Sequence, residues 1–364
     1  MKLVIGKDTV LSGLQTVHGV VNVRPTLPVL SNVLFEAREN KLWLTTTDME
    51  VTMRCVVEAQ VSSAGATTIP ARRLLSIIRE LPADNIEIDV DDKNAASITC
   101  GSAFFKINGL PDDEFPVIPK SEDGHTFTMD QKVLKEMLQK TFYAASTDET
   151  RFILNGTLMS FKGNKLTLVA TDGRRLALTE HELEFPKEFE CEAIVPTKAV
   201  NELIRILKDD GVVKIHTGKN QASFELDGVT LTTKLIEGTY PNFRQVIPGQ
   251  CEQRIAVERE ILLTALKRVA LLTSEKSSSI KLTFGKNKLK ISASSPEVGE
   301  AHESVAIKYN AKEIQVAFNP DYIMEPLRNI ANDEVFVELT DELSPGVIKC
   351  DVPFIYVLMP MRIS

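Results

Sequence analysis

The stretch Asn164–Leu178 reads NKLTLVATDGRRLAL, and the same local design occurs three times in the chain. The other two copies are NKLWLTTTDMEVTM, beginning at Asn40, and NKLKISASSPEVGE, beginning at Asn287. Each copy has an Asn-Lys turn, an alternating strand and then a small polar corner, at Asp48, Asp172 or Ser295. Because the copies recur at an offset of about 124 residues, the sequence predicts a tandem repeat.

Two amphipathic helices flank every copy at the same offset, which a coincidence at one place would not produce. The apolar residues of the upstream helices lie at helical spacing, at Val10, Leu11, Leu14 and Val17, at Val133, Leu134, Met137 and Leu138, and at Ile261, Leu262, Ala265, Leu266 and Val269. The downstream stripes are Leu74, Ile77 and Ile78, then Val200, Leu203, Ile204 and Leu207, then Ile323, Met324, Leu327 and Ile330. A proline precedes each downstream helix or begins it, at Pro70, Pro196 and Pro320.

Short alternating runs follow the second helix of each repeat, beginning at Ile86, Val212 and Val335. Each repeat then closes on a proline-containing segment that we expect to be a strand: Phe115–Pro119, Tyr240–Pro248 and Tyr356–Arg362. The pattern predicts an α+β protein of three tandem similar domains, with limits at 1–121, 122–250 and 251–364.

The composition is typical of a soluble globular protein, with 43% apolar and 25% charged residues among 364. No apolar window is long enough to span a bilayer. Lys7 and Asp8 interrupt the position where a signal peptide needs its apolar run, so we expect a cytoplasmic protein. The five cysteines are scattered singly and the five histidines lack metal-ligand spacing, so we expect no cofactor and no zinc site.

The net charge of −8 argues against a protein that binds nucleic acid with its whole surface. The second helix of each repeat nevertheless carries basic residues opposite its apolar stripe, at Arg72, Arg73 and Arg79, at Lys198, Arg205 and Lys208, and at Arg328. Simple solvation of these helix faces is the alternative to a segregated binding surface.

The sequence contains no assembled catalytic motif, neither a phosphate-binding loop nor a nucleophile elbow. The TDGRR corner is more informative, because Asp172 and Gly173 signal a turn and two arginines follow where the strand resumes. The corner is either a partner site or an exposed basic edge that deters strand pairing.

Four motifs carry a resemblance to a known family: RPTLPVLSN from Arg24, ATDGRRLA from Ala170, EGTYPNFRQVIP from Glu237 and YVLMPMR from Tyr356. Together with the threefold repeat, and in this order along the whole chain, they resemble the bacterial DNA polymerase III beta subunits, the sliding clamps. The resemblance implies a homodimeric ring of six domains, with helices lining a central hole and antiparallel sheets outside. Such a ring encircles duplex DNA without reading its sequence and confers processivity on a polymerase, with no covalent chemistry.

The resemblance also implies a cleft between the second and third domains that binds short linear peptides of the polymerase III catalytic subunit, the clamp loader, other polymerases and repair proteins. Its residues are Leu154, Thr171, Gly173, Arg174, Arg175, Leu176, Pro241, Val246, Asn319, Tyr322, Leu343, Met359, Pro360, Met361 and Arg362. Gln245 stands where some relatives have a basic residue.

Two further sets of residues follow from the resemblance. The DNA contacts are expected at Arg24, Arg72, Arg73, Phe152, Lys198 and Arg205, with Ile153 where relatives can carry a second aromatic residue. The subunit interface is expected to join Phe105 and Ile107 of one copy to Leu271 and Leu272 of the other, with charge pairs around Glu297 and Glu300.

Two other classes of protein stay open at this point. One is an acidic repeat scaffold that binds peptides but never encircles DNA, and the other is an enzyme with a dispersed site. A clamp of plasmid or phage origin is a variant of the main interpretation.

Overall fold

Each repeat contains two helices, and their predicted apolar stripes are buried or partly buried except at Ile261, which is 44% exposed. The computed structural model describes residues 1–22, 27–116, 124–185, 189–249, 251–274 and 279–362. Its α-helices are α1 (Lys7–His18), α2 (Ala71–Glu80), α3 (Gln131–Thr141), α4 (Thr197–Ile206), α5 (Arg259–Ala270) and α6 (Pro320–Asn329). In α2, Leu74 and Ile78 are buried while Arg72 and Arg73 are exposed, which is the segregation expected of an amphipathic helix.

The strands fall into two groups per repeat, one on either side of the second helix. The first repeat contains β1 (Lys2–Gly6), β2 (Asn32–Arg38), β3 (Lys41–Thr47), β4 (Val51–Glu58), β5 (Gln60–Ser63), β6 (Gly65–Pro70), β7 (Asn85–Val90), β8 (Ala95–Cys100) and β9 (Ala103–Asn108). The second contains β10 (His125–Asp130), β11 (Gly156–Lys162), β12 (Lys165–Thr171), β13 (Arg175–Glu182), β14 (Cys191–Pro196), β15 (Val212–Thr217), β16 (Gln221–Leu226) and β17 (Val229–Lys234). The third contains β18 (Gln253–Glu258), β19 (Ile280–Gly285), β20 (Lys288–Ser295), β21 (Gly299–Ala306), β22 (Ile314–Phe318), β23 (Glu334–Leu339), β24 (Gly346–Lys349) and β25 (Phe354–Leu358).

The turn before the third strand of each repeat explains the recurring Asn. Asn40, Asn164 and Asn287 have φ angles of 55°, 59° and 53°. This left-handed region costs most side chains energy, but Asn tolerates it. The Asn-Lys motif is therefore a hairpin signal, as the sequence predicts.

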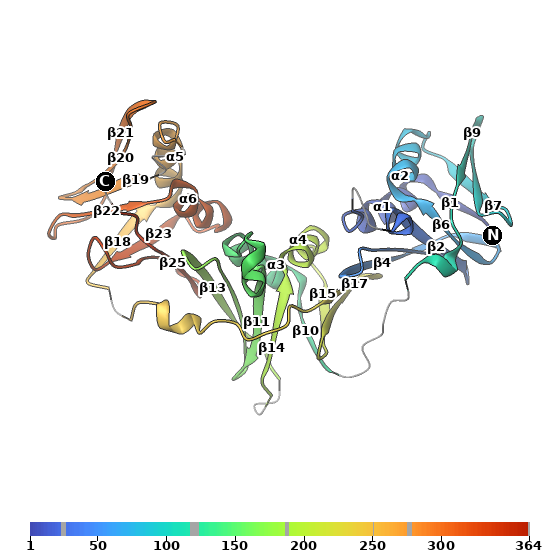
Figure 1. Cartoon of the computed structure of the whole chain (residues 1–364), viewed down its shortest axis with the longest axis horizontal. Helices are drawn as coiled ribbons and strands as arrows, with labels where there is room; N and C mark the ends of the chain where they lie inside the picture. The colour runs from blue at the N-terminus through green and yellow to red at the C-terminus, as the bar shows by residue number, and fades with distance from the viewer. Residues whose placement is uncertain (23–26, 117–123, 186–188, 250, 275–278, 363–364) are drawn as a thin grey trace. The chain divides into compact units, whose positions relative to one another are not determined.

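The chain divides into two compact units that do not coincide with the three repeats (Figure 1). Unit 1 comprises Met1–Lys135 and Lys198–Leu235, and unit 2 comprises Glu136–Thr197 and Ile236–Ser364. The middle repeat is thus shared between the two, and each unit joins half of it to one terminal repeat.

An antiparallel strand pair makes that join in each unit. In unit 1, β4 pairs with β17 inside the sheet β10-β15-β16-β17-β4-β3-β2-β6, and a second sheet has the order β5-β1-β7-β8-β9. In unit 2, β13 pairs with β25 inside the sheet β14-β11-β12-β13-β25-β24-β23-β18, and a second sheet has the order β21-β20-β19-β22. The antiparallel sheets and segregated helices confirm the α+β prediction.

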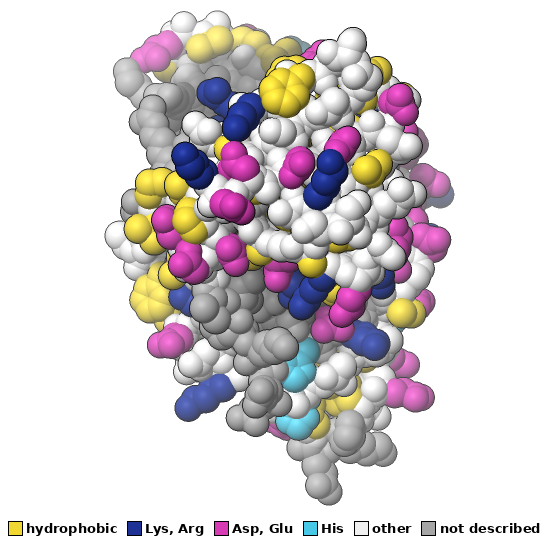
Figure 2. Space-filling model, turned by 90° about the vertical axis from the view of Figure 1, so that its right-hand side faces the viewer, with side chains coloured by type: hydrophobic (Ala, Val, Ile, Leu, Met, Phe, Trp, Pro, Cys, Tyr) yellow, Lys and Arg dark blue, Asp and Glu magenta, His cyan; other side chains and the backbone are white. Residues whose placement is uncertain are grey.

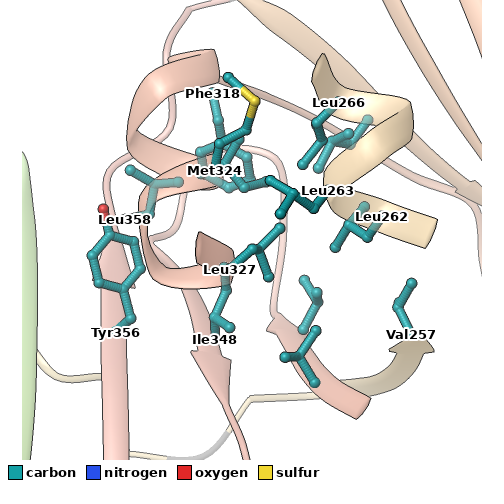
Figure 3. Close-up of a cluster of buried hydrophobic side chains, with 14 of the residues drawn as sticks. Val257, Leu262, Leu263, Leu266, Phe318, Met324, Leu327, Ile348, Tyr356 and Leu358 are labelled. Atoms are coloured by element: carbon teal, nitrogen blue, oxygen red, sulfur yellow. The ribbon is translucent and has the colours of Figure 1, made fainter. Parts of the chain in front are cut away.

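The core of the third repeat shows how its helices are held (Figure 3). Leu262, Leu263 and Leu266 of α5 face Met324 and Leu327 of α6, and all five side chains are at most 4% exposed. Burying each such side chain contributes roughly 1.5–3 kcal/mol relative to leaving it in water. The apolar stripes therefore fix α5 and α6 against each other and against the sheet.

One predicted strand is wrong. The segment Tyr240–Pro248 contains a short 3-10 helix, Phe243–Val246, instead of extended backbone. Pro241 and Pro248 lack the N–H that a strand ladder needs, so the segment cannot pair along its length. It instead packs Tyr240 and Phe243 onto the β11–β13 face, where they join a cluster with Leu158.

Candidate partner-binding site

The TDGRR corner is a turn that is closed by its own side chains. Asp172 Oδ1 accepts hydrogen bonds from the backbone N–H groups of Arg174 and Arg175, at 2.8 and 3.0 Å. Thr171 Oγ1 donates to the Arg175 carbonyl at 2.6 Å and accepts from the Gly173 N–H at 3.1 Å. Gly173 has a φ of 83°, where a side chain is strained. The corner is therefore a rigid part of unit 2.

Arg175 turns inward from this corner and connects it to the third repeat. Its side chain is 9% exposed, and its Nε lies 3.1 Å from Asp172 Oδ2. Its guanidinium forms an ion pair with Glu325 of α6 and lies 4.2 Å from the ring centroid of Tyr322. It also donates to the Tyr143 carbonyl at 2.6 Å. The guanidinium thus bonds to groups of the protein itself, and these contacts hold α6 beside β13.

A cavity of about 330 Å³ opens beside the corner in unit 2. Of the predicted cleft residues, Arg174, Arg175 and Tyr322 line it. The lining also includes Asp172 of the corner and five residues that sequence reasoning missed, namely Ala145, Ser146, Thr147, Asp148 and Arg151. Arg151 donates to the Asp172 carbonyl at 3.1 Å, and hydrogen bonds from Thr150 hold the pKa of Asp148 below its ordinary value. The run SerThrAspGluThrArg has no periodicity or motif, so only the fold brings it here.

The apolar wall of the predicted cleft is present. Leu176 is buried and Leu154 is partly buried in one cluster with Tyr240 and Val357. Burial raises the pKa of Tyr240, so its hydroxyl stays neutral. Pro241 lies at the edge of a second cavity of about 610 Å³ between this segment and the sheet.

Three large apolar side chains of the predicted cleft are exposed in unit 2. Leu343 is 81% exposed, Val246 50% and Met359 44%. Exposed apolar groups are typical of surfaces that bind other proteins when they gather in one area. The Met359 N–H donates to the Arg174 carbonyl at 2.9 Å, so the C-terminal segment runs directly beside the corner.

The same segment continues to the neighbouring sheet of the third repeat. The Met361 N–H donates to the Ala317 carbonyl on β22 at 2.8 Å, with Pro360 between the two anchored residues and Arg362 after them. Asn319 begins α6, where its Oδ1 accepts from the backbone N–H groups of Asp321 and Tyr322. The structure thus places ten predicted cleft residues on three adjoining features, which are the corner, the C-terminal segment and the start of α6: Thr171, Gly173, Arg174, Arg175, Asn319, Tyr322, Met359, Pro360, Met361 and Arg362.

Two of the residues predicted to contact DNA have protein partners in unit 1. Lys198 donates to the Val20 carbonyl at 3.1 Å and Asn22 Oδ1 at 2.9 Å, and pairs with Asp48. Arg205 donates to the carbonyls of Gln15 and Thr16 in the last turn of α1 and pairs with Glu202. Arg205 thus caps carbonyl groups that the end of α1 leaves without helical partners, whereas Lys198 contacts the segment after α1 and the Asp48 corner.

The other predicted DNA contacts are more accessible. Arg72 and Arg73 are exposed on α2, and Phe152 is 57% exposed. Burial and the charges of Arg72, Arg205 and Arg79 lower the pKa of His18 in the last turn of α1. Arg24 lies outside the described residues.

The residues predicted to form a subunit interface lie on or near two edge strands. Phe105 is 38% exposed on β9, where Ile107 is buried. Leu271, which follows α5, is 75% exposed, and Leu272 comes next. Glu300 is on β21 and Glu297 is in the turn before it.

Comparisons with known proteins decide the family. The chain matches the N-terminal, central and C-terminal domain models of the DNA polymerase III beta subunit over residues 1–119, 128–242 and 244–362. The chain belongs to this family. It is 36% identical to the beta sliding clamp of Chlamydia muridarum, with 100% of this chain and 99% of the relative covered, and 34% identical to that of Pseudomonas aeruginosa over the full length of both.

Solved structures agree with the family assignment. The DNA polymerase sliding clamp of Bacillus subtilis has a TM-score of 0.95 at 28% identity, and a Pseudomonas aeruginosa clamp bound to griselimycin has 0.95 at 34%, with full coverage of both chains in each case. The protein therefore has the three-domain DNA clamp fold. Its role is that of a processivity clamp in DNA replication, an accessory polymerase subunit and not an enzyme.

Two negative observations concern the described part of the chain. Its His, Cys, Asp and Glu side chains form no group of three or more that could hold a metal ion. Within the same residues, the helices are too short or too polar to cross a membrane.

Proposed function

We propose that two copies of this clamp close head to tail into a ring around duplex DNA, and that partner proteins dock on unit 2 through short linear peptides. We further propose that the repeats, at 1–121, 122–250 and 251–364, are its three domains, and that it works in the cytoplasm.

The observation that supports a ring is a pair of strand edges left open. The strands β4, β13 and β21 occupy the same place in successive repeats, as do β9, β17 and β25. Within the chain, β4 pairs with β17 and β13 pairs with β25. In the described residues β21 and β9 are both edge strands. If β21 of one copy pairs with β9 of another, the same join occurs a third time.

Such a contact joins two different surfaces, so copies can add head to tail until the rotation between successive copies closes the assembly into a ring. With two copies, two contacts close the ring. The exposed side chains beside the open edges suit burial there, because Phe105 and Leu271 are large and apolar. An open edge with such neighbours invites pairing, and a partner copy removes that liability.

Sedimentation across a dilution series tests the ring. A stable species of twice the 40.4 kDa chain mass supports it, and a monomer at all concentrations contradicts it. Leu272→Asp should give monomers because it places a carboxylate in the apolar contact. Leu343→Asp is the matched control, since it puts the same charge on a leucine that we assign to the cleft.

For DNA, we propose that Arg72 and Arg73 of α2 attract the phosphate backbone without reading bases. Lys198 and Arg205 contribute to the field there, but Lys198 also binds Val20, Asn22 and Asp48, and Arg205 also binds the end of α1. A closed ring should remain on circular DNA at moderate salt and leave after the circle is cut. Equal loss from circular and linear DNA would favour a peptide-binding scaffold that never encircles DNA.

For partners, we propose that the exposed side chains Val246, Leu343 and Met359 receive apolar side chains of an extended peptide, while Arg174 meets its polar groups. The polymerase III catalytic subunit, the clamp loader, other polymerases and repair proteins are the expected sources. A fluorescent peptide rich in Leu and Phe should bind the native protein and lose at least tenfold in affinity with Met359→Asp, by the cost of a charge in an apolar contact. Unchanged binding would exclude this cleft.

A further inference from the structure

Corresponding rows of side chains differ between the middle and third repeats. In an antiparallel sheet, directly opposed residues share one face. In the middle repeat the row across β14, β11, β12 and β13 is Ile194, Leu158, Val169 and Leu178. All four belong to the apolar cluster that Tyr240 covers. An extended segment of the same chain thus covers this face.

The corresponding row of the third repeat is polar. Across β22, β19, β20 and β21 it reads Ala317, Lys281, Ser292 and His302. The next row on this face contains Thr283, Lys290 and Ser304 with Gln315. Lys290 and His302 are exposed, and Lys281 is half-buried. The face that is apolar and covered in one repeat is hydroxyl-rich, basic and accessible in the other.

The lysines of this face lack carboxylate partners. Among the described residues no Asp or Glu oxygen lies within 4.0 Å of the ammonium groups of Lys281, Lys288 or Lys290. The carboxylates on this face are those of Glu300, opposite Ser294, and Glu313, which lies beside Gly285 and accepts a hydrogen bond from Gln315; Glu303, between His302 and Ser304, pairs with Arg268 instead.

The first repeat provides the contrast. On its outer sheet Lys2 pairs with Glu87 and Asp89, and Lys106 pairs with Asp91. On the face in Figure 2, blue Lys and Arg side chains are interspersed with magenta Asp and Glu side chains. Although the protein has a net charge of −8, the lysines of this third-repeat face are not neutralised as Lys2 and Lys106 are.

The row connects this face to the cleft. Met361, a cleft residue, pairs directly with Ala317, which pairs with Lys281. Met361 and Lys281 are thus two strand spacings apart, roughly 10 Å. An extended chain crosses that distance in about three residues, and Lys290 is one strand further.

We propose that the exposed face of β19–β22 binds the acidic flank of the partner polypeptide whose apolar motif occupies the cleft. This inference rests on the proposed function. The lysines of this face attract Asp and Glu side chains, and its hydroxyl groups can donate further hydrogen bonds to them. The row of residues from Met361 to Lys281 gives the flank a path from the cleft to this face. In the middle repeat, Tyr240 and its neighbours from the same chain cover the corresponding face. In the third repeat, the flank of a separate polypeptide would cover it.

The test compares two labelled peptides on the full-length protein. Both carry the same Leu- and Phe-rich segment, and five residues at one end are either Asp and Glu or Ser and Gly. Each peptide is made with the flank at either end, because the direction of the chain in the cleft decides which end reaches Lys281. One acidic peptide should bind about fivefold more tightly at low ionic strength, and the difference should vanish near 0.5 M salt.

Charge-swap variants locate the effect. The double variant Lys281→Glu and Lys290→Glu should abolish the preference for the acidic flank and create a preference for a Lys flank. Lys214→Glu with Lys219→Glu is the matched control and should change nothing, because both lysines are exposed and belong to unit 1, whereas the cleft and this face belong to unit 2. The milder pair Lys281→Gln and Lys290→Gln should remove the preference without reversal, which guards against loss of folding.

The outcomes separate the two proposals. Equal binding of both peptides, with both lost in Met359→Asp, overturns the flank inference and leaves the cleft standing. Failure of both peptides to bind overturns the cleft itself and, with it, the inference. If the swap variants weaken retention on circular DNA and leave peptide binding intact, the face serves nucleic acid and the inference is wrong.

Discussion

The corner at Asp48 in unit 1 and the corner at Asp172 in unit 2 have the same backbone but different cations. Asp48 Oδ1 accepts from the N–H groups of Glu50 and Val51 at 3.0 and 2.7 Å, as Asp172 does two and three residues on. Met49 has a φ of 80°, and its counterpart Gly173 has 83°. The two turns therefore have one design.

The difference is where the positive charge comes from. In unit 2 the corner supplies its own cation, Arg175, which reaches Glu325 and Tyr322 of the next repeat. In unit 1 the position of Arg175 is Val51, and the cation comes from the neighbouring helix, as Lys198. In unit 2 a cavity whose lining includes Arg174 and Tyr322 lies beside the corner. In unit 1 Lys198 covers Asp48, whose side chain is 6% exposed. The same turn thus stands beside an open cavity in one repeat and is covered by a lysine in another.

The largest effect expected from this comparison is that of Arg175→Ala. It leaves Glu325 and Asp172 without their buried cation, and breaking such a pair costs about 3 kcal/mol or more of stability. The free energy of unfolding in urea, with hydrogen exchange to locate the loss in unit 2, measures it. Arg174→Ala is the control, because its guanidinium faces the cavity. A change below about 1 kcal/mol in Arg175→Ala would show that the pair is not a structural joint.

The backbone of the two corners gives a reciprocal test. Gly173→Ala should destabilise by about 1 kcal/mol, because its φ is left-handed. Met49→Gly should relieve the same left-handed strain, although glycine also gives the unfolded chain more freedom. We therefore expect a net stabilisation of less than about 1 kcal/mol. Thermal and urea unfolding of both variants measures this. The same sign in both would mean that the corners are not equivalent.

A smaller effect is expected for Lys198→Ala. The Lys198 side chain is 36% exposed, so removing its contacts should cost at most about 1 kcal/mol. The loss should shrink at high salt, whereas that of Arg175→Ala should not. Unfolding at two salt concentrations separates the two joints. A salt-independent loss in Lys198→Ala would show that its hydrogen bonds to Val20 and Asn22 dominate.

The smallest effect concerns pH in unit 1. The pKa of His18 is lowered in the folded state, so above the ordinary pKa near 6.5 both states are neutral and stability is unaffected. As pH falls below that value the unfolded chain binds a proton more readily, and stability declines until the folded His18 also titrates. His18→Gln should flatten this decline, as measured by unfolding between pH 7 and pH 5. An NMR titration in which His18 changes at or above pH 6.5 would contradict the prediction.

Sequence reasoning found the repeated elements because they depend on local signals. Helical stripes such as Leu74 and Ile78, and left-handed turns such as Asn164, are readable from spacing and residue type. It failed at Tyr240–Pro248, which it predicted to be a strand, because the prolines and the apolar β11–β13 face favour a covering segment. It also missed Arg151 and Asp148, because residues with no periodicity enter a site only through the fold.

The sequence by itself determined the threefold repeat, the six amphipathic helices, the hairpin turns and the family, because each depends on residues close together in the chain or on motifs in fixed order. Only the tertiary structure decided that Arg175 is buried against Glu325 while Arg174, in the turn before β13, is exposed, since burial depends on which elements pack against each side chain. It also decided that Lys281, Ser292 and His302 form one exposed row ending at Met361, because strand register is set by long-range pairing and not by local preference.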